Sequence, residues 1–210
     1  MPYHKSPAVI IRSLDFAEWD KLITFFTRDY GKLKGVAKGA KRSRKRFGSA
    51  LEPLTYTTVS FFEKERAQLV RLDRCEIIES FPQIHNDVLR VGYASYLGEL
   101  INEMVAEREA NRDLFTLFIT FLSLLNEKDF REEFIRIFEL RLLSLSGYQP
   151  EFGRCVMCRK EVNGTREHNF SQQRGGLICL DCFQGSHNSP RLSGGTIKTI
   201  QRAQTIELSK

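Results

Sequence analysis

The stretch LTYTTVSFF, from Leu54 to Phe62, decides how the first third of the chain folds. Thr57, Val59 and Phe61 alternate with more polar neighbours, which is the period of a strand that buries one face. Further runs of β-branched and aromatic residues occupy 7–14, 21–28, 31–39 and 67–80. Four to six short strands without a long helix predict a small barrel, which Phe81-Pro82 closes because proline does not continue a central strand.

The apolar period changes to that of helices after this barrel. We expect helices over 87–105, 113–125 and about 130–146, each with apolar residues recurring at three- and four-residue intervals. Asp87 can cap the first helix, and Gly147 fits the end of the third. The apolar segment within 113–125 is too short to cross a membrane, so it predicts a buried core helix.

The basic run GKLKGVAKGAKRSRKRFG, residues 31–48, interrupts the strands and contains no acid. Lys and Arg number 16 against 8 Asp and Glu in residues 1–75, whereas the remaining 135 residues are nearly balanced, with 16 against 18. A charge run is often only a solvated surface. Here the glycines and the flanking apolar residues favour a packed, phosphate-binding segment. Tyr30, Phe47 and Tyr56 are candidates to stack bases, although we expect at least two of them in the core.

Four of the five cysteines form two Cys-x-x-Cys pairs separated by 20 residues: Cys155, Cys158, Cys179 and Cys182. This spacing is typical of a structural zinc site, in which four thiolates complete the tetrahedral shell of one Zn²⁺. The surrounding residues are short of aliphatic side chains, so a metal would supply the missing stability. His168 lies between the pairs and is expected at the surface, while Cys75 is expected in the barrel core.

The sequence also excludes several classes of function. There is no apolar run long enough for a signal peptide or a transmembrane helix, and neither phosphate-loop nor dinucleotide-binding glycine motifs occur. The acidic run at 131–134 is expected on a solvated helix face, and no carboxylate cluster marks a catalytic centre. We therefore expect a protein that is not an enzyme and has no membrane partner.

Three blocks of sequence carry a resemblance to a known family. They are WDKLITFFTRDYGKLKGVAKGAKRSRKRFGSALEP (19–53), YLGELINEMVAEREANRDLFTLF (96–118) and IFELRLLSLSGYQPEFGRCVMC (137–158). Together they resemble the bacterial recombination mediators of the RecO family, over residues 8 to about 195. The resemblance implies an α+β multidomain fold: an N-terminal OB-fold barrel, then a helical bundle domain with an inserted zinc-binding segment of four cysteines.

The resemblance implies a division of the chain into four parts. Residues 1–82 would form the nucleic-acid-binding OB-fold, 83–150 the helical domain and 151–190 the zinc-binding segment. Residues 191–210 would begin a C-terminal helical part, with Ser193 as a helix cap. Members of the family continue further, so we expect the chain to be naturally short or truncated there, and no residues are assigned to a partner-tail site.

The resemblance also implies a function. The family binds single- and double-stranded DNA, anneals complementary strands and works with RecR. It contacts the C-terminal tail of single-stranded DNA-binding protein, so that RecA loads on coated strands; this implies a cytoplasmic, nucleoid-associated protein. By position, the basic segment of the family's OB-fold falls on seven residues: Lys34, Lys38, Lys41, Arg42, Arg44, Lys45 and Arg46.

Two alternatives remain open from the residues alone. The first is an RNA-binding protein that combines an OB-fold with a zinc ribbon, favoured by the basic residues near the cysteines: Arg154, Arg159, Lys160, Arg166 and Arg174. The second is a nucleic-acid enzyme, which the missing carboxylate cluster disfavours. A preference for RNA over DNA would distinguish the first, and metal-dependent turnover the second.

Overall fold

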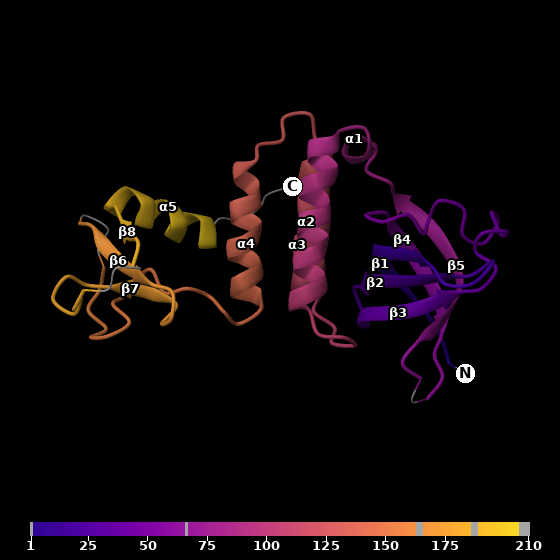
Figure 1. Cartoon of the computed structure of the whole chain (residues 1–210), viewed down its shortest axis with the longest axis horizontal. Coiled ribbons are helices and arrows are strands. Elements are labelled where there is room, and N and C mark those ends of the chain that lie inside the picture. Colours follow the sequence, from indigo (N-terminus) through magenta and orange to yellow (C-terminus); the bar gives the residue numbers. More distant parts are fainter. Residues whose placement is uncertain (1, 66, 163–165, 186–188, 206–210) are drawn as a thin grey trace. The chain divides into compact units, whose positions relative to one another are not determined.

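The structure is a computed structural model that describes residues 2–65, 67–162, 166–185 and 189–205. By backbone packing, the chain divides into two compact units, 1–135 and 136–210. The first unit holds a β-barrel and helices, and the second holds a small sheet, a terminal helix and the cysteine pairs (Figure 1). The chain is thus α+β, as the sequence predicts.

Five strands form a closed barrel in the first unit, in the order β1-β2-β3-β5-β4. Neighbouring strands are antiparallel except β3 and β5, which are parallel. Their bounds are β1 Tyr3–Asp15, β2 Lys21–Thr27, β3 Gly31–Ala37, β4 Tyr56–Phe62 and β5 Val70–Glu79. The run 67–80, expected to give one or two strands, forms one.

The barrel core follows the alternation that the sequence predicts. Thr57, Val59 and Phe61 on β4 are all buried. They share the interior with side chains from every other strand, among them Ile10, Phe25, Leu33 and Leu72. Thr57 satisfies its hydroxyl by donating to the carbonyl of Glu76 at 2.7 Å, so a polar side chain is tolerated inside.

Three helices complete the first unit: α1 Pro82–His85, α2 Val88–Met104 and α3 Arg112–Asn126. Pro82 follows the last strand, as predicted, and begins α1. The Asp87 carboxylate accepts from the amides of Leu89 and Arg90, which confirms it as the cap of α2. The next helix begins slightly before Asp113, because Asn111 caps it through the amide of Leu114.

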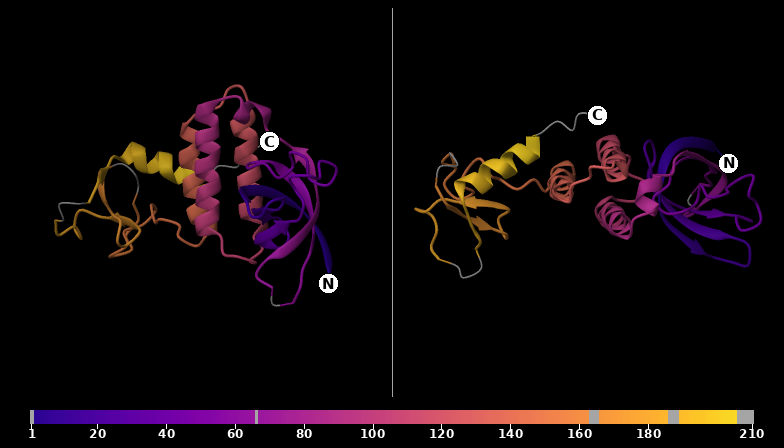
Figure 2. Two further views of the ribbon diagram at one scale, coloured as in Figure 1. Left: turned by 45° about the vertical axis from the view of Figure 1, so that its right-hand side comes forward. Right: turned by 90° about the horizontal axis from the view of Figure 1, so that it is seen from above.

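Helices α2 and α3 run side by side (Figure 2). The apolar segment within 113–125 lies in α3, and it is a buried core helix, as predicted. Its buried members are Leu114, Phe115, Leu117, Phe118, Phe121, Leu122 and Leu125. Phe115 packs against the barrel through the rings of Phe26 and Tyr56, at 5.6 and 6.1 Å between centroids.

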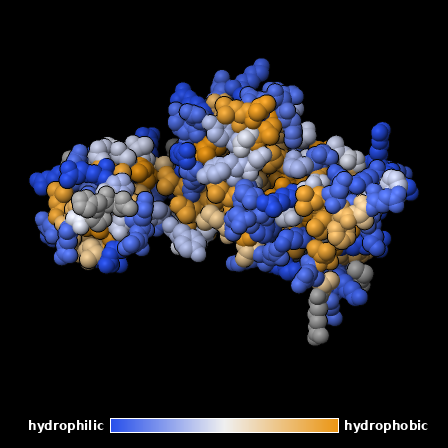
Figure 3. Space-filling view, viewed as in Figure 1, coloured by the Kyte–Doolittle hydropathy of each residue, from blue (hydrophilic) through white to orange (hydrophobic). Residues whose placement is uncertain are grey.

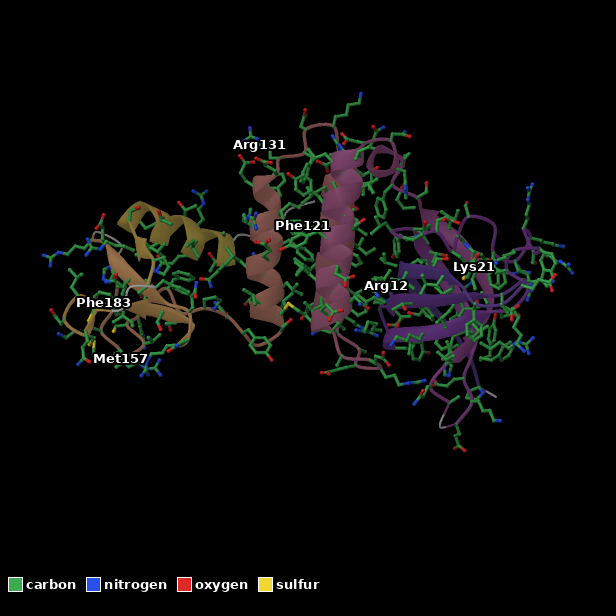
Figure 4. All side chains as sticks on the ribbon, in the orientation of Figure 1. Arg12, Lys21, Phe121, Arg131, Met157 and Phe183 are labelled. Carbon is green, nitrogen blue, oxygen red and sulfur yellow. The ribbon has the colours of Figure 1, made fainter. Side chains whose placement is uncertain are left out.

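Polar contacts also join the barrel to these helices. The buried Lys32 side chain donates to the carbonyl of Asn102 at the end of α2, and the Lys32 carbonyl accepts from the amide of Arg108. Gly31 has φ +70°, and a Cβ there would overlap with the backbone of Glu109. The Nη2 atom of Arg12 donates to both carboxylate oxygens of Glu99, at 2.8 Å to each (Figure 4). Barrel and helices therefore pack as one body.

The helix α4, Glu133–Leu145, leads into the second unit, and Gly147 follows it with φ +82°, as expected of a helix stop. A small sheet of order β7-β6-β8 comes next, with β6 at His168–Ser171, β7 at Gly176–Ile178 and β8 at Arg191–Leu192. The last helix, α5, spans Gly194–Thr205. The Ser193 hydroxyl accepts from the amide of Thr196 at 3.1 Å, which confirms the predicted cap.

The core of the second unit is small. Its buried members are Phe152, Val162, Leu177 and Ile197. Phe170 stacks on Phe152, with the rings 5.3 Å apart and 13° from parallel. Aliphatic burial is therefore limited to a few side chains, as the composition of 151–190 indicates, and two of the contributors to this core come from β7 and α5.

Candidate nucleic-acid interface and metal centre

The segment 38–55, which links β3 to β4, closes one end of the barrel with its apolar side chains. Phe47, Ala50 and Leu51 are buried in the barrel core. The carbonyl of Arg46 accepts from the amide of Cys75 at 2.9 Å, which ties the segment to β5. The basic side chains between these anchors are therefore carried by a folded segment rather than by a tail.

Hydrophilic surface covers this end of the barrel at the right of Figure 3. Lys21, labelled at the same end in Figure 4, pairs with Ala37, the last residue of β3 before the segment begins. The bend at the start of the segment is fixed by Gly39, which has φ +65° and donates its amide to the Asp20 carboxylate at 2.8 Å. The segment thus lies next to the β1–β2 loop.

Four of the seven predicted DNA-binding residues are exposed without an acidic partner among the described residues, and one of these, Arg42, stacks on an aromatic ring. Within the described part of the chain, Lys38, Arg44 and Lys45 make no ion pair. Because their charge is not offset locally, these three are the most available to phosphate oxygens.

Three others already have partners. Lys34 contacts the Glu107 carboxylate at 2.6 Å, and Lys41 contacts Asp15 at 2.8 Å. The hydrogen bond from Lys34 lowers the pKa of Glu107, so this carboxylate stays charged and competes with phosphate for the lysine. Arg46 donates to the Lys38 carbonyl at 2.6 Å and to Ser43 at 3.1 Å, so it holds the segment in shape.

The seventh residue, Arg42, stacks its guanidinium on the indole of Trp19, 3.1 Å from the ring centroid. Trp19 lies in the β1–β2 loop, and its carbonyl accepts from the amide of Lys41 at 3.1 Å. Our reading of the sequence missed Trp19. The available signal was a single tryptophan in the polar turn DFAEWD between two predicted strands, where burial in the core is not expected.

The three aromatic residues proposed to stack bases are occupied by packing. Phe47 is in the core, and Tyr30 packs against the core and hydrogen-bonds to His4 at 3.2 Å between Oη and Nδ1. Tyr56 packs on Phe115. Tyr30 and Tyr56 are half-buried, so the expectation that at least two of the three belong to the core holds for Phe47 only.

The four paired cysteines converge in the second unit. The Sγ atoms of Cys155, Cys158, Cys179 and Cys182 all lie within 4.8 Å of one another. Figure 4 shows several sulfur atoms, in yellow, close to the labelled Met157, which lies between Cys155 and Cys158 in the sequence. Among the residues that the structure describes, this is the one group of His, Cys, Asp and Glu side chains with metal-binding geometry.

The electrostatics of this cluster suit a cation. Burial raises the pKa of Cys155, but backbone amides of Cys179, Cys158 and Met157 outweigh it and lower the pKa to about 6. Contacts with the sulfurs of Cys179 and Cys158 raise the pKa of Cys182 to about 12. Four thiolates cannot share this space unless a positive ion neutralises them, so the donor set fits one soft divalent metal.

Two other predictions near the cysteines have clear outcomes. The prediction that His168 lies at the surface was wrong. The residue is buried on β6, and its Nδ1 lies 3.0 Å from the carbonyl of Arg166, because the strand, not side-chain polarity, sets which way it points. Cys75 lies in the barrel core, as predicted, and burial raises the pKa of its thiol to about 12.

The basic residues near the cysteines are only partly offset. Lys160 pairs with Asp181 at 3.3 Å, and Arg154 with Glu161 at 3.9 Å. Arg159 and Arg174 are exposed and make no ion pair with any residue of the described ranges. None of the helices described has the length and apolarity that a membrane crossing requires.

Comparison with known proteins agrees with the architecture. The model of the family "Recombination protein O N terminal" matches residues 1–81, the barrel, and that of "Recombination protein O C terminal" matches 85–210. The chain is similar to the DNA repair protein RecO of Syntrophus aciditrophicus, with 37% identity over 99% of this chain and 81% of that protein. Identity to RecO of Symbiobacterium thermophilum is 34%, over 96% of this chain and 80% of that protein.

These matches span both the barrel with its basic segment and the part that carries the four cysteines. The resemblance noted in the three sequence blocks is thereby confirmed over nearly the whole chain. The chain belongs to the RecO family of DNA repair proteins.

Proposed function

We propose that the protein is a non-enzymatic mediator of recombinational DNA repair, which binds DNA and anneals complementary single strands. The observation that carries the proposal is the set of unpaired basic side chains, Lys38, Arg44 and Lys45, on a folded segment at the end of the barrel. Contacts from such side chains to phosphates carry no sequence information, which suits a protein that must act on any strand.

Annealing follows from the same charges. Two single strands repel each other through their phosphates, and a strand held on a cationic surface repels the second strand less. No energy source is needed, because the duplex that forms is more stable than the separate strands. The basic segment would therefore act by neutralising charge, and its effect would fall steeply with salt.

Family membership supports further parts of the proposal. With RecR, the protein would help RecA to load on strands coated by single-stranded DNA-binding protein, whose C-terminal tail it would contact, in the cytoplasm at the nucleoid. The metal would be one structural Zn²⁺ held by Cys155, Cys158, Cys179 and Cys182, whose place in the second unit supports a role in folding.

Strand annealing is the experiment that tests the proposal. Two complementary oligonucleotides with donor and acceptor dyes would be mixed without ATP, with and without single-stranded DNA-binding protein. The expected result is accelerated annealing on bare and on coated strands. A folded, metal-loaded protein that accelerates neither would contradict the proposal, and acceleration on bare strands only would remove the partner contact from it.

A matched pair of variants locates the DNA contact. Arg44→Ala with Lys45→Ala removes two unpaired charges and should slow annealing. Lys5→Ala with Arg74→Ala removes two charges from the same barrel that share the Glu76 carboxylate as a partner, at 3.9 and 3.6 Å, and should slow annealing much less. Tighter binding to RNA than to DNA of the same sequence would instead favour an RNA-binding protein, for which Arg159 and Arg174 would be the first residues to test.

A further inference from the structure

The β1–β2 loop places exposed apolar side chains next to the basic segment. Trp19 is 37% exposed and Phe16 is 56% exposed, and Leu14, near the end of β1, is also 56% exposed. This loop is bound to the basic segment through Gly39, Lys41 and Arg42, as described above. A large indole at the surface beside unpaired cations is the combination on which single-stranded nucleic acids are held by stacking.

The indole of Trp19 is already used as a stacking surface. The Arg42 guanidinium lies flat on it at 3.1 Å, and no described residue offers Arg42 an acidic partner. Nucleobases and guanidinium groups bind the same kind of aromatic face. The backbone of Trp19, in contrast, holds the loop to Lys41 through its carbonyl, a contact that does not depend on the side chain.

We propose that Trp19 stacks on a base of single-stranded DNA, with Arg42 contacting the adjacent phosphate. The inference rests on the proposed DNA-binding function and deepens it, because it names what distinguishes a single strand from a duplex. In a duplex the base faces are covered by their neighbours, whereas a single strand exposes them. Charge alone holds both forms, and Trp19 adds affinity for the unpaired one.

The chain contains one tryptophan, so fluorescence excited at a wavelength that its six tyrosines do not absorb reports on this residue alone. The wild-type protein would be titrated with an oligothymidylate and with an abasic oligomer of equal length and charge, at one salt concentration. Quenching by the oligothymidylate well beyond that by the abasic oligomer is expected. Equal quenching by both, with binding verified by the anisotropy of a labelled strand, would overturn the stacking contact.

Variants give the second readout, by the anisotropy of labelled strands. Trp19→Ala should weaken single-strand binding by about 5- to 150-fold, the range for loss of one stacked base, and leave duplex binding and the salt slope unchanged. Trp19→Phe should recover part of the loss. Tyr148→Ala, which removes an exposed aromatic of the second unit, should have no effect.

The outcomes separate the two proposals. If the wild-type protein binds neither oligomer, the proposed DNA-binding function fails. If the wild-type protein binds both oligomers, the DNA-binding function stands. The stacking contact is then wrong if Trp19→Ala weakens single-strand and duplex binding equally, or if it weakens neither of them.

Discussion

The barrel and the cysteine-bearing part of the second unit solve the same problem by different means. The barrel buries side chains from all five strands together with Phe47, Ala50 and Leu51 of the basic segment. The second unit buries Phe152, Val162, Leu177 and Ile197, around a sheet whose strands are two to four residues long.

The difference shows that a domain with a large hydrophobic core does not need a metal site to stabilise its fold. Each buried apolar side chain contributes about 1.5–3 kcal/mol, so the barrel gains enough to order its residues, and its one cysteine is only a packing side chain. The second unit gains too little by this route, and four sulfurs converge where more core would otherwise be needed. Metal removal should therefore unfold the second unit, whereas truncation of a core side chain should destabilise the barrel.

Loss of the metal should produce the largest effect and should be confined to the second unit. Cys155→Ser removes the buried ligand of a site whose metal contributes about 10–16 kcal/mol in comparable small domains. We expect metal affinity to fall by orders of magnitude and amide protection to disappear over 151–162 and 166–182. Hydrogen exchange with metal analysis measures both. Cys75→Ala should keep the metal, and simultaneous loss of protection in the barrel strands would contradict the comparison.

Truncation of a core side chain in the barrel should destabilise the first unit and leave the second unit intact. Phe61→Ala should lower the free energy of unfolding by about 3–5 kcal/mol, because Phe61 is fully buried, and leave metal content unchanged. Urea unfolding followed by hydrogen exchange in both units measures this. Phe62→Ala is the matched control: it is the next residue on β4, points outward and rests on Tyr3, so a loss well below that of Phe61→Ala is expected. Equal losses would mean that the barrel does not depend on its interior.

Both regions carry exposed basic side chains without an ion pair among the described residues, so both are candidate sites for the proposed nucleic-acid binding. Arg44→Ala with Lys45→Ala should reduce the slope of log affinity against log salt by about 1.4–1.8, the value for two lost phosphate contacts. Arg159→Ala with Arg174→Ala should change the slope less if the barrel is the main site. Binding isotherms at several salt concentrations measure both slopes. A larger change from the second pair would place the main interface in the unit that carries the four cysteines.

The smallest expected effect is a difference in thiol reactivity between Cys75 and the four paired cysteines. Burial raises the pKa of Cys75 to about 12, so its thiol stays neutral and unreactive at pH 8 while the barrel is folded. After chelation, mass spectrometry of alkylated protein should find Cys155, Cys158, Cys179 and Cys182 modified and Cys75 not. Modification of all five thiols at pH 8 without denaturant would show that the barrel opens when the metal leaves.

The raised pKa of Cys75 also predicts how the stability of the barrel changes with pH. The unfolded thiol loses its proton above about pH 8.5, whereas the folded one keeps it up to about pH 12. In that interval the unfolded state binds fewer protons, so stability attributable to Cys75 falls as pH rises, by up to about 1.4 kcal/mol per unit. Below pH 8 the group contributes no pH dependence, and Cys75→Ala should remove the alkaline effect.

Local patterns in the sequence predicted much of this structure. The alternation at Thr57, Val59 and Phe61, the cap at Asp87 and the two cysteine pairs each depend on residues close together in the chain, where spacing alone fixes geometry. The barrel itself followed from the number and shortness of its strands.

The features that could not be predicted depend on residues distant in sequence. Lys34 is paired with Glu107, and the Arg42 guanidinium lies on one face of the Trp19 indole, although nothing near either residue signals the partner. The charge run thus indicated a basic surface but could not say which of its cations are free. His168 shows the complementary error: its polarity suggested solvent, whereas its place on a strand between two others determines its burial.

Gly31 has a mechanical consequence. Its missing side chain lets the end of the β2–β3 turn touch the backbone of Glu109, while Lys32 holds the end of α2. Main chain therefore lies directly against main chain where β3 meets the α2–α3 loop, with no side chains between them. A displacement of β3 would therefore be passed directly to the loop between α2 and α3, so the barrel and this loop should move together.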